Sequence, residues 1–131
     1  MKAIESVAPL RLQEEYDNSG LQVGLPDAEV RRVLVSLDIT EKVVEEAVEK
    51  DCQMVVSHHP LIFRALKKLT DSTWQQRCVS LAIRSGIALY SAHTNLDNAR
   101  GGVNFEIAER LGLRDVDFLQ SKPGEDAGSG I

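Results

Sequence analysis

Three short apolar runs stand out along the chain: VLVSL at 33–37, MVV at 54–56 and IALYSA at 87–92. Within each run the apolar residues are nearly continuous instead of alternating with polar ones, which is typical of strands that helices cover on both faces. The runs therefore predict three buried β-strands, near 33–37, 54–57 and 87–92.

Amphipathic helical patterns lie between and after these strands, over residues 41–50, 73–85 and 103–112. Thr40 is placed to cap the first helix, and Ser72 with Gln75 has the spacing of a capping box at the start of the second. Gly112 ends the third. Because strands and helices alternate, the pattern predicts an α/β fold of βαβ units with right-handed crossovers, in which the three strands are adjacent in a mainly parallel sheet.

The end of the chain carries weaker signals. VDFL at 116–119 is a candidate for one more strand, whereas residues 121–131 contain a proline and three glycines and are expected to form a loop or flexible tail. A length of 131 residues with 43% hydrophobic content suits one domain with a single core. We therefore expect a domain over residues 1–120, followed by a tail at 121–131.

Charge and composition narrow the class of protein. The formal net charge of −5 argues against a broad basic surface for nucleic acid or for an anionic membrane. The N-terminus has no apolar segment of signal-peptide length, and no stretch approaches the roughly 18 apolar residues of a spanning helix. Cys52 and Cys78 lack CxxC spacing and are expected to be small buried residues in a reducing compartment. These features predict a cytoplasmic protein that binds neither membrane nor nucleic acid.

Titratable side chains follow each of the three predicted strands. Asp38 comes after the first strand, His58 and His59 after the second, and His93 and Asp97 after the third. Parallel strands bring their carboxyl ends to the same edge of the sheet, which is where ligands of open α/β sheets bind. We therefore expect these side chains to converge on one site.

Each part of this pattern has a simpler explanation when it is taken alone. Adjacent histidines occur in surface loops, and His93 could belong to a turn that leads into a helix, with Asn95, Asp97 or Asn98 as caps. Taken together, imidazole and carboxylate side chains without thiolates suit Zn, Mn, Fe, Co or Ni in a hydrolytic site. The combined pattern therefore favours a metal centre, and no serine or cysteine has a convincing histidine and carboxylate relay of its own.

Four blocks of the sequence resemble one known family in both order and spacing: EEYDNSGLQVG at 14–24, SLDIT at 36–40, SHHPLIF at 57–63 and SAHTNLDNARGGVN at 91–104. The family is the Nif3-like family, also known as the GTP cyclohydrolase I type 2 homologs, whose members carry a dinuclear metal centre. The resemblance runs from about residue 8 to 120, so it covers nearly the whole chain.

The resemblance implies a three-layer α/β/α sandwich, two divalent metal ions at the carboxyl edge of the sheet, and ring-shaped homo-oligomers, commonly hexamers. By motif, His58 and His59 would bind one metal ion each, and Asp97 would join the ion of His58. His93 would lie beside the site as a supporting or catalytic group. Together with Asp38, it is a candidate for orienting the ligands or moving protons.

Members of the family continue into a second half, where a His-x-x-x-Glu motif supplies the remaining ligands, and this sequence contains no such motif. The resemblance is therefore to the N-terminal portion of the family. We expect this 131-residue form to hold one metal ion or none unless metal is supplied, because it contains three of the five side chains that bind the metal ions in the family. We also expect it to expose apolar surface that favours self-association.

Two functions are consistent with this set of residues. The first is a divalent-metal-dependent hydrolase that acts on a small molecule through a metal-activated water, with a nucleotide as the substrate that the family name implies. The alternative is a non-catalytic metal-binding scaffold or a regulatory protein that binds a partner through the same edge of the sheet.

Overall fold

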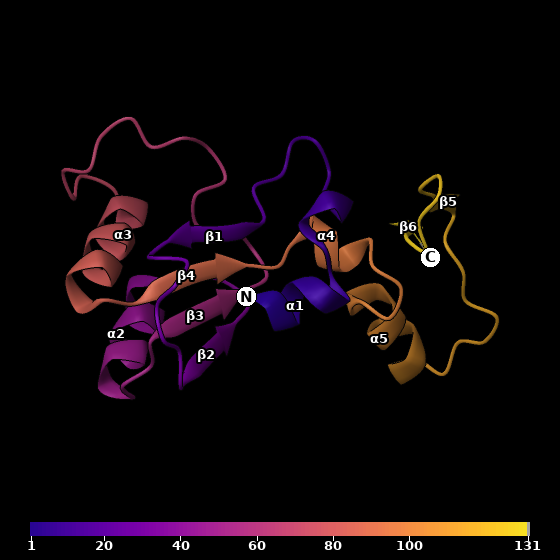
Figure 1. Ribbon diagram of the computed structural model, residues 1–131, viewed down its shortest axis with the longest axis horizontal. Helices are drawn as coiled ribbons and strands as arrows, with labels where there is room; N and C mark the ends of the chain where they lie inside the picture. Colours follow the sequence, from indigo (N-terminus) through magenta and orange to yellow (C-terminus); the bar gives the residue numbers. More distant parts are fainter. Residues whose placement is uncertain (131) are drawn as a thin grey trace. The chain divides into compact units, whose positions relative to one another are not determined.

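The computed structural model describes residues 1–130, in which the chain forms two compact units (Figure 1). The sheet unit comprises residues 18–92, and the terminal unit comprises residues 1–17 together with the segment that begins at His93. No helix in the described part of the chain has both the length and the apolar character needed to cross a membrane.

Four strands form the sheet of the sheet unit, in the order β1-β4-β3-β2. Their bounds are β1, Gly20–Val23; β2, Val33–Ser36; β3, Met54–Ser57; and β4, Ala88–Ser91. β2 is parallel to β3, and β3 is parallel to β4, which confirms the three predicted strands and their adjacency. β1 pairs antiparallel with β4 at the edge of the sheet and was not predicted. Its four residues, GLQV, begin with glycine and include a glutamine, so they carry little strand signal.

Two helices cover one face of this sheet: α2, Glu41–Glu49, and α3, Trp74–Ser85. Thr40 caps α2 as predicted, since its hydroxyl accepts a hydrogen bond from the backbone N–H of Val43. The expected cap of α3 at Ser72 is wrong by one residue. Thr73 caps this helix by accepting from the N–H of Gln76, whose amide oxygen in turn accepts from the backbone N–H of Ser72. The motif TDST offers several cap residues in succession, so sequence spacing alone does not choose among them.

The core of the sheet unit lies between these helices and the sheet. Val44 of α2, Cys78 of α3, Val55 of β3 and Leu89 of β4 are completely buried in one apolar cluster. Because Val55 and Leu89 stand opposite each other in register, they face the same side of the sheet. Burial of this apolar surface is therefore what holds α2, α3 and the parallel strands together.

The terminal unit is built from short elements around a smaller core. They are α1, Lys2–Val7; the 3-10 helix η1, Leu10–Leu12; α4, Thr94–Asp97; α5, Val103–Arg110; β5, Gln120–Ser121; and β6, Gly128–Ser129. Ala8, Leu12, Ala99 and Ala127 are its buried apolar residues, with Leu96 packed against them. α5 begins where the sequence predicted and ends two residues before Gly112.

The strand expected at 116–119 is wrong, because β pairing begins only at Gln120, opposite Ser129. Side chains from the predicted stretch bind Arg100 instead. The guanidinium of Arg100 lies 4.8 Å from the centre of the Phe118 ring and 2.8 Å from the carboxylate of Asp117. A cation over an aromatic ring and an ion pair favour this arrangement over a further strand.

The burial of Cys78 leads to a prediction about thiol reactivity. Burial raises the pKa of the Cys78 thiol to about 11, so at pH 8 this group stays protonated and lacks the nucleophilic thiolate form. Cys52 is only partly buried. We expect a thiol reagent at pH 8 to modify Cys52 in the folded chain and Cys78 only after unfolding in urea, as measured by mass spectrometry. Cys52→Ser is the control, and rapid modification of folded Cys52→Ser would contradict this account of the core.

Candidate metal centre

The candidate site is built at the carboxyl ends of the three parallel strands. Each strand ends in a serine, and Ser36, Ser57 and Ser91 stand opposite one another in register. The hydroxyl of Ser36 donates to the carbonyl of Asp38 at 2.8 Å, and that of Ser57 donates to the carbonyl of His59 at 2.8 Å. These bonds close a turn directly after the strand. Neighbouring side chains that would point to opposite faces of a continuing strand can therefore approach one site.

His58 is held by the backbone of the neighbouring strand. Its Nδ1 lies 3.0 Å from the carbonyl oxygen of Ala92, directly after β4. A carbonyl oxygen only accepts hydrogen bonds, so Nδ1 must carry the proton, and the lone pair of the neutral ring lies on Nε2. The contact thus fixes both the orientation of the ring and the nitrogen that is able to bind a metal.

His59 is oriented in the same way by a side chain. Its Nδ1 lies 2.8 Å from Oδ1 of Asp38, the residue that the sequence placed after the first strand. Since a carboxylate is also an acceptor, this ring likewise carries its proton on Nδ1. Both side chains are about half exposed, at 48% for His59 and 60% for Asp38, so water competes for this contact.

His93 has a buried partner. Its Nδ1 lies 2.8 Å from Oδ1 of Asp17, whose side chain is 0% exposed. The other carboxylate oxygen of Asp17 accepts from the backbone N–H of Thr94 at 3.0 Å and from the hydroxyl of Thr94. In each of these hydrogen bonds the carboxylate of Asp17 is the acceptor, which again puts the ring proton of His93 on Nδ1.

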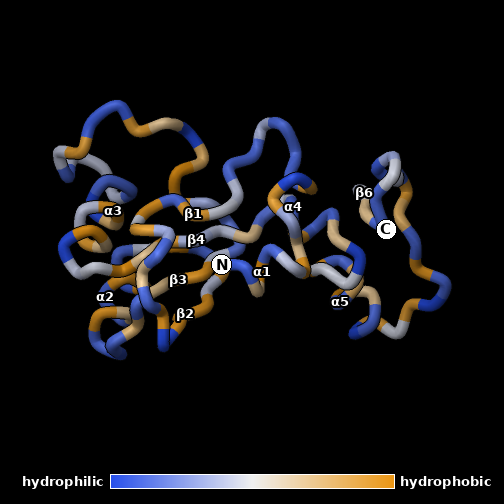
Figure 2. The backbone as a smooth tube through the Cα atoms, viewed as in Figure 1, coloured by the Kyte–Doolittle hydropathy of each residue, from blue (hydrophilic) through white to orange (hydrophobic). Residues whose placement is uncertain are grey.

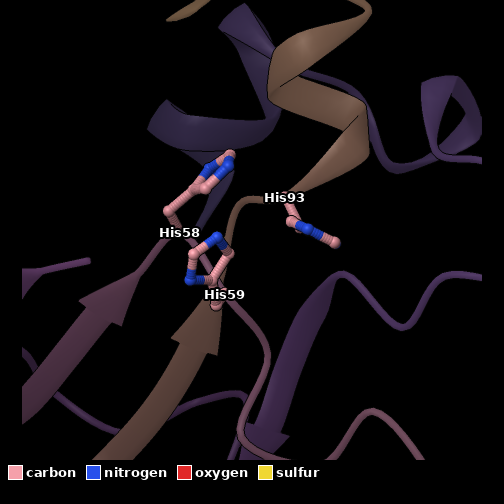
Figure 3. A group of neighbouring side chains, drawn as sticks. All are labelled: His58, His59 and His93. Carbon is pink, nitrogen blue, oxygen red and sulfur yellow. The ribbon is translucent and has the colours of Figure 1, made fainter. Parts of the chain in front are cut away.

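The three histidines form a group that could hold a metal ion. One potential ligand atom from each of His58, His59 and His93 lies within 4.8 Å of the corresponding atoms of the other two. Figure 3 shows His58 and His59 beyond the end of β3, and His93 where the chain leaves β4 and enters α4. The chain has three histidines, so this group contains all of them.

Two buried asparagines hold the segment that carries Asp17 against α4. The side-chain amide of Asn95 donates to the carbonyl of Ala8 at 2.7 Å, and its oxygen accepts from the backbone N–H of His93 at 2.9 Å. The side-chain amide of Asn98 donates to the carbonyl of Leu12 at 2.9 Å. These asparagines therefore do more than cap a turn, since Asn95 joins residue 8 to α4 and Asn98 joins residue 12 to the end of α4.

The predicted site residues are found as follows. His58, His59 and His93 share the cluster, and Asp38 contacts the ring of His59. Asp97 is the last residue of α4, and its backbone N–H donates to the carbonyl of His93 at 3.1 Å. Its assignment as a ligand of the same ion as His58 remains a prediction.

Asp17 and Thr94 were missed as site residues. Both lie within the sequence blocks that carry the family resemblance, at EEYDNSG and SAHTNLD, which is the signal that could have drawn attention to them. Nothing in the local pattern shows that an aspartate before Asn-Ser-Gly is buried, because polar residues in such a segment usually mark an exposed turn.

Comparisons with known proteins indicate one family. A family model described as Duf34/NIF3 (NGG1p interacting factor 3) matches residues 1–131. A protein of Clostridium acetobutylicum named "GTP cyclohydrolase 1 type 2 homolog" is 39% identical over 129 residues, which cover 97% of this chain and 48% of that protein. "NIF3-like protein 1" of Drosophila melanogaster is 35% identical over 131 residues, covering 99% of this chain and 45% of that protein.

Among solved structures, a Bacillus cereus protein related to NIF3 matches with a TM-score of 0.84 and 42% identity, over 90% of this chain and 32% of that one. The chain thus spans about half the length of the two curated relatives. The resemblance found in the four sequence blocks is confirmed by a match that extends over the chain, and this chain belongs to the Duf34/NIF3 family.

Proposed function

We propose that this chain carries the histidine ligands of a divalent-metal centre in a metal-dependent hydrolase. The observation that supports the proposal most directly is the shared state of the three rings. Each has its Nδ1 bound to an acceptor, which leaves Nε2 as the nitrogen with the lone pair, and one potential ligand atom of each ring lies within 4.8 Å of those of the other two. Histidines in metal sites are commonly oriented in this way, by carbonyls and carboxylates on the nitrogen that does not bind the metal.

The chemistry of the side chains fits a metal of intermediate hardness. Imidazole nitrogens with nearby carboxylates suit Zn, Fe, Mn, Co or Ni, and the only two thiols of the sequence, Cys52 and Cys78, are not in the cluster. We assign two ions to the complete centre, one bound by His58 and one by His59, with Asp97 joining the ion of His58. When bound, such ions activate water for attack at neutral pH and polarise the group that is attacked.

The side chains around the rings divide the remaining tasks. Asp38 orients His59 through the contact at 2.8 Å, so His59 would hold an ion through Nε2. His93 is the candidate for moving a proton, because its Nε2 is the nitrogen that can accept one while Nδ1 is held by Asp17. A nucleotide is the substrate we propose, supported by the name "GTP cyclohydrolase 1 type 2 homolog" that the relatives carry.

The second face of the sheet supports two further proposals about the whole protein. Leu89 faces α2 and α3, so Tyr90 points to the other side, and it is also completely buried, which supports the three-layer α/β/α sandwich. Towards the edge, Val33 and Val35 of β2 lie on the same face as Tyr90 and are 45% and 75% exposed. Figure 2 shows the apolar colour along β2. An exposed apolar edge of this kind supports a homo-oligomer.

We expect the 131-residue chain, stripped of metal and then dialysed against Zn²⁺ or Mn²⁺, to bind metal through its histidines. His58→Ala and His59→Ala should each weaken the affinity at least about tenfold, since losing a ligand costs no less than losing a group that orients one. Titration with elemental analysis measures this. Glu29→Ala, at a carboxylate that is 76% exposed, is the control and should bind like the parent chain. Equal affinity in all four proteins would contradict the proposed centre.

Turnover distinguishes a hydrolase from a scaffold. We expect the metal-loaded chain to release formate or phosphate from a panel of nucleotides. His93→Ala should abolish that release while metal content stays constant, because His93 is proposed to move a proton and not to bind the ion. Colorimetric phosphate and enzymatic formate assays measure the products. Full metal occupancy without turnover by the parent chain on any nucleotide would favour the scaffold function instead.

Self-association should depend on the exposed strand β2. Val35→Lys places a charge on the apolar edge and is expected to shift the chain towards monomer, because burying an unpaired ammonium in an interface is costly. Light scattering after size-exclusion chromatography measures the mass. The matched control is Leu25→Lys, at a side chain that is 74% exposed but lies after β1. If both variants keep the mass of the parent chain, β2 is not the interface.

A further inference from the structure

We propose that Asp17 is the positioning residue that fixes the tautomer of His93, and so decides which nitrogen of this ring serves the metal centre. The inference rests on the proposed function only in assigning a task to His93. The tautomer itself is a property of the metal-free chain and can be measured without any reaction.

The hydrogen bonds that join Asp17 to Thr94 and His93 all use the carboxylate as the acceptor. Thr94 offers two donors to Oδ2 of Asp17: its backbone N–H at 3.0 Å, and its hydroxyl. That hydroxyl also accepts from the backbone N–H of Glu14 at 2.9 Å, which directs its proton towards Asp17. Oδ2 accepts from both donors of Thr94, and Oδ1 accepts from Nδ1 of His93 at 2.8 Å.

Because its partner Asp17 is buried, the tautomer of His93 is fixed more firmly than that of His59, and unlike that of His58 it depends on a side chain that can be substituted. The side chain of Asp17 is 0% exposed, so bulk solvent does not reach it to replace a partner that is lost or reversed. Asp38, which holds His59, is 60% exposed and can exchange its contact with solvent. The partner of His58 is the carbonyl of Ala92, which no side-chain substitution removes.

Asp17→Asn tests this arrangement because it preserves size while replacing one acceptor oxygen by a donor. The backbone N–H of Thr94 cannot change its role, so the amide oxygen of the introduced asparagine must face Thr94, and its NH₂ group must then face Nδ1 of His93. An NH₂ group needs an acceptor, which forces the lone pair onto Nδ1 and the proton onto Nε2. The substitution is therefore expected to reverse the tautomer without changing the shape of the site. When an aspartate beside a catalytic histidine is replaced by asparagine in this way, the histidine is known to take the wrong tautomer.

The experiment measures long-range ¹H–¹⁵N correlations of the histidine rings in the metal-free chain. In the parent chain we expect the proton of His93 on Nδ1, and in Asp17→Asn on Nε2. Asp38→Asn is the matched control. It makes the same chemical change at a contact of equal length, but the exposed amide of this variant can rotate and give its oxygen to His59, so the tautomers of His59 and His93 should not change.

In the metal-loaded chain, Asp17→Asn should lower turnover by between about 10-fold and 10⁴-fold, while bound metal per chain stays constant. A proton on Nε2 in the parent chain, or on Nδ1 in folded Asp17→Asn, would overturn the inference. So would a reversed tautomer in Asp17→Asn with the turnover of the parent chain. If Asp17→Asn fails to fold, the tautomer of the parent chain decides the outcome. A parent chain with the expected tautomer that binds no metal would overturn the proposed function and leave the role of Asp17 intact.

Discussion

The alignment of three parallel strands is the constraint on which the rest of the site depends. Ser36, Ser57 and Ser91 end β2, β3 and β4 at the same level of the sheet. Since the hydroxyl of Ser57 donates its proton to the carbonyl of His59, the 2.9 Å contact between the Ser57 and Ser91 hydroxyls must be donated by Ser91. This buried contact ties the ends of two strands together. The residues directly after each strand therefore leave the sheet from one edge, which is the geometric condition for a shared site.

The position of one proton on each histidine ring decides which ring nitrogen carries the lone pair. The structure uses three different acceptors for this purpose: a backbone carbonyl for His58, an exposed carboxylate for His59 and a buried carboxylate for His93. The three contacts have similar lengths but different exposure. The buried one is the least tolerant of change, because a polar group without solvent must find its partners within the protein.

The two faces of the sheet differ in how far their side chains are buried. One face is covered by α2 and α3, and its central residues are fully buried. On the other face burial falls from Tyr90 in β4, through the partly buried Val56, to the exposed Val35 in β2, although the three residues stand side by side in register. Apolar side chains that are exposed at a sheet edge are costly for an isolated chain.

The sequence by itself determined the parallel strands, the helices that connect them and the position of the histidines directly after two of the strands, because these depend on local periodicity and on the residues at the end of each strand. Short elements without periodicity were missed, as with the edge strand β1, and the exact cap of α3 was misplaced by one residue within TDST. Only the tertiary structure revealed Asp17 as part of the site, since its partner His93 lies 76 positions away along the chain. Burial and hydrogen bonding over such a separation are properties of the folded chain, and no local pattern of residues encodes which of two ring nitrogens will carry a proton.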